Sequence, residues 1–188
     1  FPYTTLFRSS VVANDLRELI AWLKANPDKV TVATSGIGGP SHVAGLLFQK
    51  QTGTRLQLIP YRGGGPAMQD VVAGQVDLML MGPSLSLQQM RNGNIKVYAI
   101  ASKTRSPSAP DIPTADEAGL PEFHVSVWHG LWAPKRTPKE IIARLNAEAV
   151  KATRSPEFVK RMNDMGYNVI GSTPDQMASM LKVEVARW

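Results

Sequence analysis

The chain has 188 residues, 43% of them hydrophobic and 19% charged, which is typical of a globular protein with one domain or two small ones. It contains no cysteine, which excludes disulfides, thiolate nucleophiles and thiolate metal sites. The net charge is +6, but the basic residues are scattered rather than gathered in a stripe. We therefore expect small anionic ligands and no nucleic-acid partner.

The first residues of the chain differ from the rest. Residues 1–10 have no clear hydrophobic period and lack the charged start and apolar stretch of a signal peptide. We therefore expect residues 1–11 to be a non-native or disordered leader. No apolar run in the sequence reaches the about 20 residues that a membrane helix needs, so no direct membrane insertion is expected.

From Asn14 onward, helical and extended patterns alternate. Asn14 is the expected cap of a first helix, with Leu16, Leu19 and Leu23 on one face. Short apolar runs predict strands, and the segments between them predict helices. The strands are expected at residues 30–34, 56–60, 76–81 and 95–101, and the helices at 43–51, 66–73 and 84–91. Such alternation predicts an α/β fold with parallel strand pairing and helices on both faces of the sheet.

The last third of the sequence changes character. Residues 102–121 hold four prolines and few apolar residues, which indicates a long connector. Residues 123–133 alternate in a way that predicts a long strand passing between two lobes. Helix-start patterns follow at Thr137, Ser155 and Thr173, the first and last as capping boxes, and residues 167–170 are a candidate short strand.

Residues 35–42, Ser-Gly-Ile-Gly-Gly-Pro-Ser-His, form the most informative motif. Small residues between a strand and a helix let backbone N–H groups approach an anion, and the helix dipole favours it. The hydroxyls of Ser35 and Ser41 add two donors. A simpler interpretation is that Ser41 only caps its helix and the glycines only turn the chain. The glycine spacing matches neither a dinucleotide fingerprint nor a P-loop.

Two further small-residue loops follow predicted strands. Residues 61–67 read Tyr-Arg-Gly-Gly-Gly-Pro-Ala, and Gly82 begins a third loop. In a parallel sheet all three loops would lie at the carboxyl ends of strands, where open α/β sheets bind ligands. A solvated surface charge is the expectation for Arg62.

Signals for catalysis or metal binding are weak. The histidines, His42, His124 and His129, have no metal-ligand spacing, and no G-x-S-x-G motif is present. Ser41 and His42 are adjacent, but neighbouring helical residues do not face each other. No enzyme activity, metal or cofactor is therefore expected. Trp128 and Trp132 should point the same way, either in a core or along a cleft.

Several motifs in order give the chain a family resemblance. It resembles the periplasmic solute-binding receptors of tripartite tricarboxylate transporters, the Bug-type receptors, from about residue 12 to residue 188. The segments that carry the resemblance are residues 33–44, 60–67, 74–78, 110–114, 117–121, 128–134 and 171–174.

This resemblance implies a periplasmic-binding-protein type II-like (flytrap) α/β fold, periplasmic localisation, a small carboxylate ligand and membrane permease partners. Family members begin with a further region that this chain lacks, so we expect a fragment: residues 12–124 as the ligand-binding lobe and residues 125–188 as a crossover strand with helices that pack on the missing lobe. The implied ligand-binding residues, with Gly82 added from its rim position, are Ser35, Gly36, Gly38, Ser41, His42, Tyr61, Gly64, Pro66, Ala67 and Gly82.

Three details of the family pattern matter later. Asp77 matches a recurring family position, but its place inside a strand suggests a structural role. Met81 and Gly82 stand where relatives often carry a polar residue, which bears on recognition of the ligand's distal group. Two alternatives stay open: a small α/β hydrolase or transferase using Ser41 and His42, and a ligand receptor for a membrane sensor.

Overall fold

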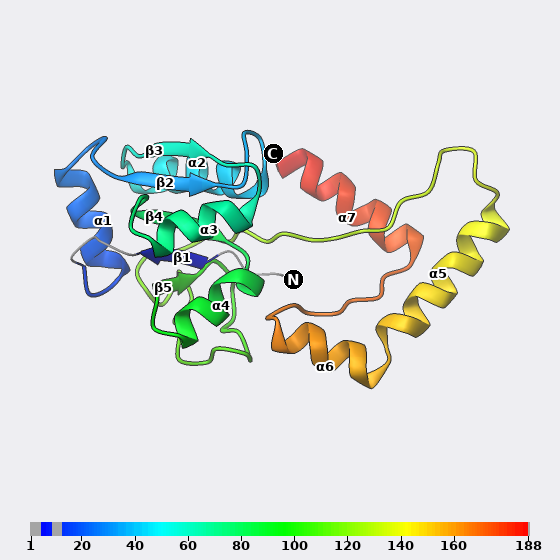
Figure 1. Cartoon of the computed structure of the whole chain (residues 1–188). Helices are drawn as coiled ribbons and strands as arrows, with labels where there is room; N and C mark the ends of the chain where they lie inside the picture. The colour runs from blue at the N-terminus through cyan, green and yellow to red at the C-terminus, as the bar shows by residue number, and fades with distance from the viewer. Residues whose placement is uncertain (1–4, 9–12, 188) are drawn as a thin grey trace.

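The computed structural model describes residues 5–8 and 13–187, and in this part of the chain five strands form one sheet in the order β3-β2-β4-β1-β5 (Figure 1). The strands are β1 (Thr5–Arg8), β2 (Thr31–Thr34), β3 (Gln57–Pro60), β4 (Leu78–Met81) and β5 (Lys96–Ile100). The helices are α1 (Leu16–Ala25), α2 (Pro40–Thr52), α3 (Gly64–Val72), α4 (Pro83–Arg91), α5 (Lys139–Thr153), α6 (Pro156–Asp164) and α7 (Pro174–Arg187).

The parallel part of the sheet agrees with the sequence analysis. Strand β2 pairs in parallel with β3 on one side and with β4 on the other. The four predicted strands and the three helices between them all form, and no end is shifted by more than three residues. The carboxyl ends of β2, β3 and β4 therefore share one edge of the sheet, as expected.

Strand β1 changes the topology. It lies between β4 and β5 and is antiparallel to both, so the sheet is mixed. The expectation that residues 1–11 are a disordered leader is therefore wrong for residues 5–8, which complete the backbone ladder between two strands. Residues 1–4 and 9–12 lie outside the described part of the chain.

Helices cover both faces of the sheet. On one face Leu16, Leu19 and Leu23 of α1 and Phe48 of α2 pack with Val32, Leu78 and Leu80. On the other face Ala67, Met68 and Val71 of α3 pack with Ala33 and Met79. Neighbouring strand residues thus enter opposite cores, because strand side chains alternate between faces. Helix α1 is capped by Asp15, whose carboxylate accepts from the Glu18 N–H, and not by Asn14.

Asp77 has the structural role that its strand position suggested. Its Oδ2 accepts hydrogen bonds from the N–H of Thr31 at 3.0 Å and from the Thr31 hydroxyl at 2.8 Å. The hydroxyl oxygen of Thr31 in turn accepts from the N–H of Asp77 at 3.1 Å. These three bonds tie the entrance of β4 to the entrance of β2, at the opposite end of the strands from the Gly-rich loops.

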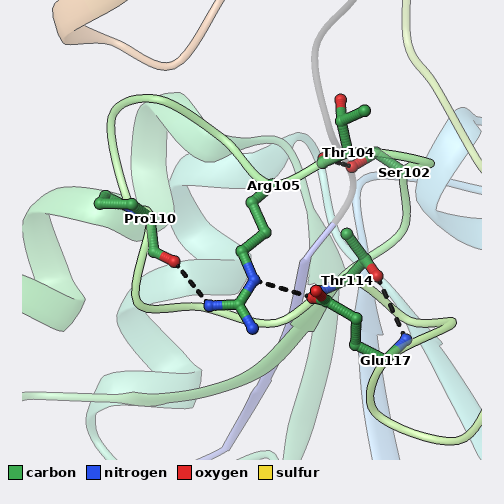
Figure 2. Close-up of polar contacts among 6 residues, drawn as sticks. All are labelled: Ser102, Thr104, Arg105, Pro110, Thr114 and Glu117. Carbon is green, nitrogen blue, oxygen red and sulfur yellow. Dashed lines mark hydrogen bonds and ion pairs between the residues drawn. The ribbon is translucent and has the colours of Figure 1, made fainter.

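The proline-rich connector is ordered by side chains rather than by regular structure. Arg105 donates from Nε to Oε2 of Glu117 at 2.8 Å and from its guanidinium to the Pro110 carbonyl at 2.9 Å (Figure 2). The same Glu117 oxygen accepts from the N–H of Thr114 at 2.8 Å. These donors, the Thr114 N–H first and Arg105 second, lower the pKa of Glu117.

Residues 126–187, which we call the arm, extend away from the sheet on the side to which the arrows of β2 and β3 point (Figure 1). Two expectations for this region were wrong, because the described residues 123–133 and 167–170 form no regular strand. The helix starts were confirmed: Ser155 caps α6, and Thr173 and Gln176 exchange the bonds of a capping box at α7. At α5, Pro138 occupies the cap position with no side-chain capping bond, so the predicted capping box at Thr137 is wrong.

The arm is poorly covered by the rest of the molecule. Helix α5 contains no buried residue, although its sequence is amphipathic. Leu145 is 57% exposed and Trp132 is 63% exposed, so Trp132 does not lie in a core, whereas Trp128 is half-buried. The rings of Trp128 and Trp132 do lie together, with centroids 6.3 Å apart.

Candidate functional site

The first Gly-rich loop joins β2 to α2. Gly36 and Gly38 have φ values of 132° and 75°, which side-chain-bearing residues rarely adopt. Gly39 is the N-cap of α2, and Ser41 lies inside the first turn. Ser41 therefore does not cap its helix, and the simpler interpretation of this serine is wrong.

The Ser41 side chain instead closes the loop on itself. It is 4% exposed, and its Oγ accepts a hydrogen bond from the N–H of Ser35 at 2.7 Å. The two hydroxyl oxygens of Ser35 and Ser41 lie 2.8 Å apart. A second bond, from the N–H of Gly39 to the Gly36 carbonyl at 3.2 Å, tightens the turn. Both ends of the loop are thus fixed relative to the start of α2.

This fold leaves donors unused on the main chain. Within the described residues, the N–H groups of Gly36, Ile37, Gly38 and Ser41 meet no protein acceptor. Ile37 and Gly38 are exposed, so a ligand can approach them from solvent. Successive unpaired N–H groups at a helix start form a site for a carboxylate, phosphate or sulfate.

The second loop lies directly beside the first. The N–H of Tyr61 donates to the Thr34 carbonyl at 2.9 Å, and the Tyr61 carbonyl lies 3.6 Å from where a side chain at Gly36 would begin. The Tyr61 hydroxyl donates to Asp70 of α3 at 2.7 Å. Burial, and secondarily this bond to Asp70, raises the pKa of Tyr61. The Tyr61 side chain is therefore fixed at the rim by α3, the helix that follows it.

The third loop, at Gly82, touches the second. A side chain at Gly64 would begin 2.7 Å from Cε of Met81 and 2.9 Å from Cδ1 of Leu85, so these two side chains pack directly against Gly64. Gly82 is the N-cap of α4, with Pro83 at the first helical position. The three loops are therefore contiguous along one sheet edge, as predicted from the sequence. We call residues 35–41, 61–65 and 82–84 the rim.

The charge around the rim favours anions. The three helices that begin there, α2, α3 and α4, carry no acidic residue in their first turn. By contrast, α1, α5, α6 and α7 each have one there, namely Glu18, Glu140, Glu157 and Asp175. An acidic residue compensates the positive end of a helix dipole. At the rim, no acidic side chain in the first turn compensates the positive ends of the α2, α3 and α4 dipoles.

The predicted site residues do not all face the rim equally. Pro66 is exposed at the start of α3, and His42 is partly buried in the first turn of α2. The Ala67 side chain is 0% exposed and packs in the core under α3, so its expected place in the cleft lining is not where the structure puts it. Its position four residues into the helix turns it toward the sheet.

The geometry does not assemble a nucleophile and a base. The Ser41 hydroxyl is engaged by Ser35, and no hydrogen bond joins it to His42. The structure therefore does not show the Ser41–His42 pair on which the hydrolase or transferase alternative depends. Within residues 5–8 and 13–187, no group of three or more His, Asp or Glu side chains is arranged to hold a metal ion.

Some rim features escaped the sequence analysis. The pairing of Ser35 with Ser41, the support of Tyr61 by Asp70 and the contact of Met81 with Gly64 join residues that are distant in the sequence or face each other only after folding. One signal was available in advance: the missing acidic residues at the starts of three helices can be read from the sequence once the helices are placed.

Comparison with known proteins finds similar chains among the Bug-type receptors, to which the sequence motifs pointed. The chain is 35% identical over 187 residues to BugT of Bordetella pertussis, covering 100% of this chain and 57% of BugT. The structure of the periplasmic binding protein BugD matches with a TM-score of 0.92 and 38% identity, over 100% of this chain and 63% of BugD. MatC of Rhodopseudomonas palustris, solved with bound malate, matches with a TM-score of 0.91 and 35% identity, over 100% of this chain and 65% of MatC.

These matches confirm the expected periplasmic-binding-protein fold. The chain spans a little over half the length of the curated relatives that it matches. The family model described as "Tripartite tricarboxylate transporter family receptor" matches residues 1–188. The chain therefore belongs to the family of tripartite tricarboxylate transporter receptors.

Proposed function

We propose that this chain carries the carboxylate-gripping part of an extracytoplasmic solute-binding receptor and that its ligand is a small carboxylate. One observation carries the proposal: the unpaired N–H groups of the first loop lie at a rim where three helix starts lack acidic residues. An anion placed there is bound by main-chain donors and by uncompensated helix dipoles. The malate found in MatC belongs to the same chemical class.

At the rim the carboxylate would be recognised mainly by main-chain donors and not by paired basic side chains. Arg62 is the charged side chain within the rim, and it is exposed. A carboxylate would therefore be held mainly by the N–H groups of Gly36, Ile37, Gly38 and Ser41 and by the Ser35 hydroxyl. Met81, at the end of β4, presents an apolar surface next to the second loop, so the part of the ligand beyond its first carboxylate meets a methionine on this side.

The partners follow from the family. We propose that the receptor delivers its ligand to the permease of a tripartite transporter. We also propose that it acts in the periplasm, since the similar protein BugD is a periplasmic binding protein. No helix within the described ranges is long and apolar enough to span a bilayer. A receptor for a membrane sensor needs the same closing cleft, and reconstitution with each partner distinguishes the two.

The arm is the proposed link to a second lobe. Residues 13–125 contain the buried clusters, whereas α5 and α6 have no buried residue and expose Ile141 and Leu145. We propose that residues 12–124 are the ligand-binding lobe and that the apolar faces of residues 125–188 pack on a further lobe. A lobe with half a cleft covers its ligand on one side only, so weak binding by the 188-residue chain is expected.

Isothermal titration tests the proposed function. The chain is titrated with acetate, malate and citrate, and with glucose as an uncharged comparison. We expect heat from at least one carboxylate and none from glucose. Binding of glucose alone, or of no anion at millimolar concentration, would contradict the proposal.

A matched pair of variants locates the site. His42→Asp places a carboxylate in the first turn of α2, whereas His42→Asn has nearly the same size and no charge. We expect the charged variant to bind a carboxylate at least about tenfold more weakly than the neutral one, since about 1.4 kcal/mol of repulsion is sufficient. Ala143→Asp, which adds the same charge on exposed α5, is the control and should leave binding unchanged. Equal affinities of the two His42 variants would place the ligand elsewhere.

A further inference from the structure

The arm meets the rim side of the lobe at one buried point, Gly166. Between residues 126 and 186, all of which are described, Gly166 is the one residue classed as buried. A side chain there would begin 2.6 Å from Cβ of Pro83 and 3.1 Å from Cδ1 of Leu87, so the backbone of residue 166 rests directly on α4. Pro83 follows Gly82 and is the first residue of α4, which makes this a contact with the rim.

The end of helix α6 fixes the geometry of this contact. Gly166 has φ 79° and follows the C-cap Met165. Its N–H donates to the Asn163 carbonyl at 2.8 Å, and the N–H of Tyr167 donates to the Met162 carbonyl at 2.8 Å. This bond pattern is a Schellman motif, which needs a left-handed residue at the position of Gly166. The motif also sets the direction in which Tyr167 leaves the helix.

Tyr167 uses that direction to reach the rim. Its hydroxyl donates to Oγ of Ser84, in the first turn of α4, at 2.8 Å. A second bond lies close by, from the Ser108 hydroxyl to the Asn163 carbonyl at 2.6 Å. The ring of His129, near the start of the arm, meets the Tyr167 ring edge-on with centroids 6.1 Å apart. A cavity of about 330 Å³ beside this cluster is lined by both the arm and the lobe.

We propose that Gly166 and Tyr167 are positioning residues that anchor the arm on the start of α4 and thereby hold the third rim loop in place. Helices α5 and α6 have no buried residues to hold the arm otherwise, so a small contact has a large influence on its position. Movement of the arm is transmitted to Pro83 and Ser84, one and two residues from Gly82. The consequence for ligand affinity rests on the proposed function, whereas the anchor itself does not.

Hydrogen–deuterium exchange of residues 83–91, together with the radius of gyration from small-angle scattering, tests the anchor without ligand. The variants are Tyr167→Phe, Ser84→Ala, their combination, and Gly166→Ala. There are two matched controls. Tyr98→Phe removes a hydroxyl that donates to the Ala13 carbonyl inside the lobe. Gly171→Ala changes a glycine of the arm with φ 62°, where a side chain would begin 3.4 Å from the Thr153 hydroxyl oxygen. Gly171→Ala carries the same backbone strain as Gly166→Ala without the contact on α4.

We expect exchange at residues 83–91 to rise about fivefold in Tyr167→Phe and in Ser84→Ala, and no further in the double variant, because both remove one hydrogen bond. Gly166→Ala should raise the exchange at residues 83–91 more than these variants do, and it should enlarge the radius of gyration. Both controls should leave the exchange at residues 83–91 as in the parent chain. Unchanged exchange in Gly166→Ala, or an equal rise in Gly171→Ala, would overturn the anchor.

Titration of the same variants with malate separates this inference from the proposed function. Weaker malate binding in Tyr167→Phe and Gly166→Ala, with parent-like binding in the controls, supports the positioning role. Altered exchange with unaltered malate affinity overturns that role. If the parent chain binds neither malate nor another carboxylate but the exchange pattern is as expected, the anchor stands and the proposed function fails.

Discussion

The hydroxyl oxygen of Ser41 accepts the N–H of Ser35 at 2.7 Å and so ties the two ends of the first rim loop together. Because Ser41 is buried, Ser41→Ala leaves that N–H without its acceptor. We expect a loss of about 1–2 kcal/mol in the free energy of unfolding and about tenfold weaker carboxylate binding. Urea unfolding and titration with malate measure both.

Ser172→Ala is the control for this substitution, since the contact of Ser172 with Asn146 uses its carbonyl and survives the change. A Ser41→Ala chain with full stability and full affinity would show that the loop does not depend on this bond.

The three bonds between Thr31 and Asp77 predict a purely structural effect. Asp77→Asn weakens two of them, and Thr31→Val removes the hydroxyl that takes part in two. Each should lower the free energy of unfolding by about 1–3 kcal/mol. The double variant should lose less than the sum, because the two residues share their bonds. Strictly additive losses in urea unfolding would argue against the pairing.

The Glu117 carboxylate predicts a pH dependence. Its donors, the Thr114 N–H and Arg105, lower its pKa in the folded chain. A carboxyl with a lowered folded pKa stabilises the fold above the unfolded pKa of about 4.3, and this contribution is lost as pH falls through the folded value. The thermal unfolding temperature of the parent should therefore exceed that of Glu117→Gln near neutral pH. This difference in unfolding temperature should shrink as the pH falls below about 4. A constant difference would indicate that the charge is not involved.

Because side chains of α5 are exposed, polar substitutions of its apolar residues should hardly change the stability of the chain. Ile141 and Leu145 are 45% and 57% exposed, so Ile141→Gln and Leu145→Gln should change the unfolding free energy by no more than about 0.5 kcal/mol each. Leu16→Ala, at a fully buried position, should cost about 2–5 kcal/mol in the same urea titration.

The same α5 substitutions should reduce the fluorescence of a bound hydrophobic dye, because they remove exposed apolar surface. A large stability loss from either one would mean that the arm is already covered in solution.

The alternation of apolar runs with helical patterns determined the α/β class, the four strands from residue 30 onward and the three loops at their carboxyl ends. These features depend on local periodicity and on the common direction of parallel strands, which a sequence contains. The caps at Ser155 and Thr173 were predictable for the same reason, since a capping residue bonds to N–H groups within three positions of itself.

The pairing of strands that are distant in the sequence was harder to predict from the sequence. The place of residues 5–8 between β4 and β5 depends on an open ladder that exists only once those strands have formed. Residues 123–133 alternate like a strand but find no continuous ladder, because alternation records which faces are apolar and not whether a partner edge is available.

For the site, the sequence by itself predicted that Ser35 to His42 is a strand–loop–helix unit suited to an anion, because glycine spacing and the flanking strand and helix patterns are local properties. Only the tertiary structure decided that Ser41 locks the loop to Ser35, that Ala67 turns into the core, and that Tyr167 rests on Ser84. Each of these depends on the direction of a side chain relative to a distant element. That direction is set by packing and is fixed only when the chain has folded.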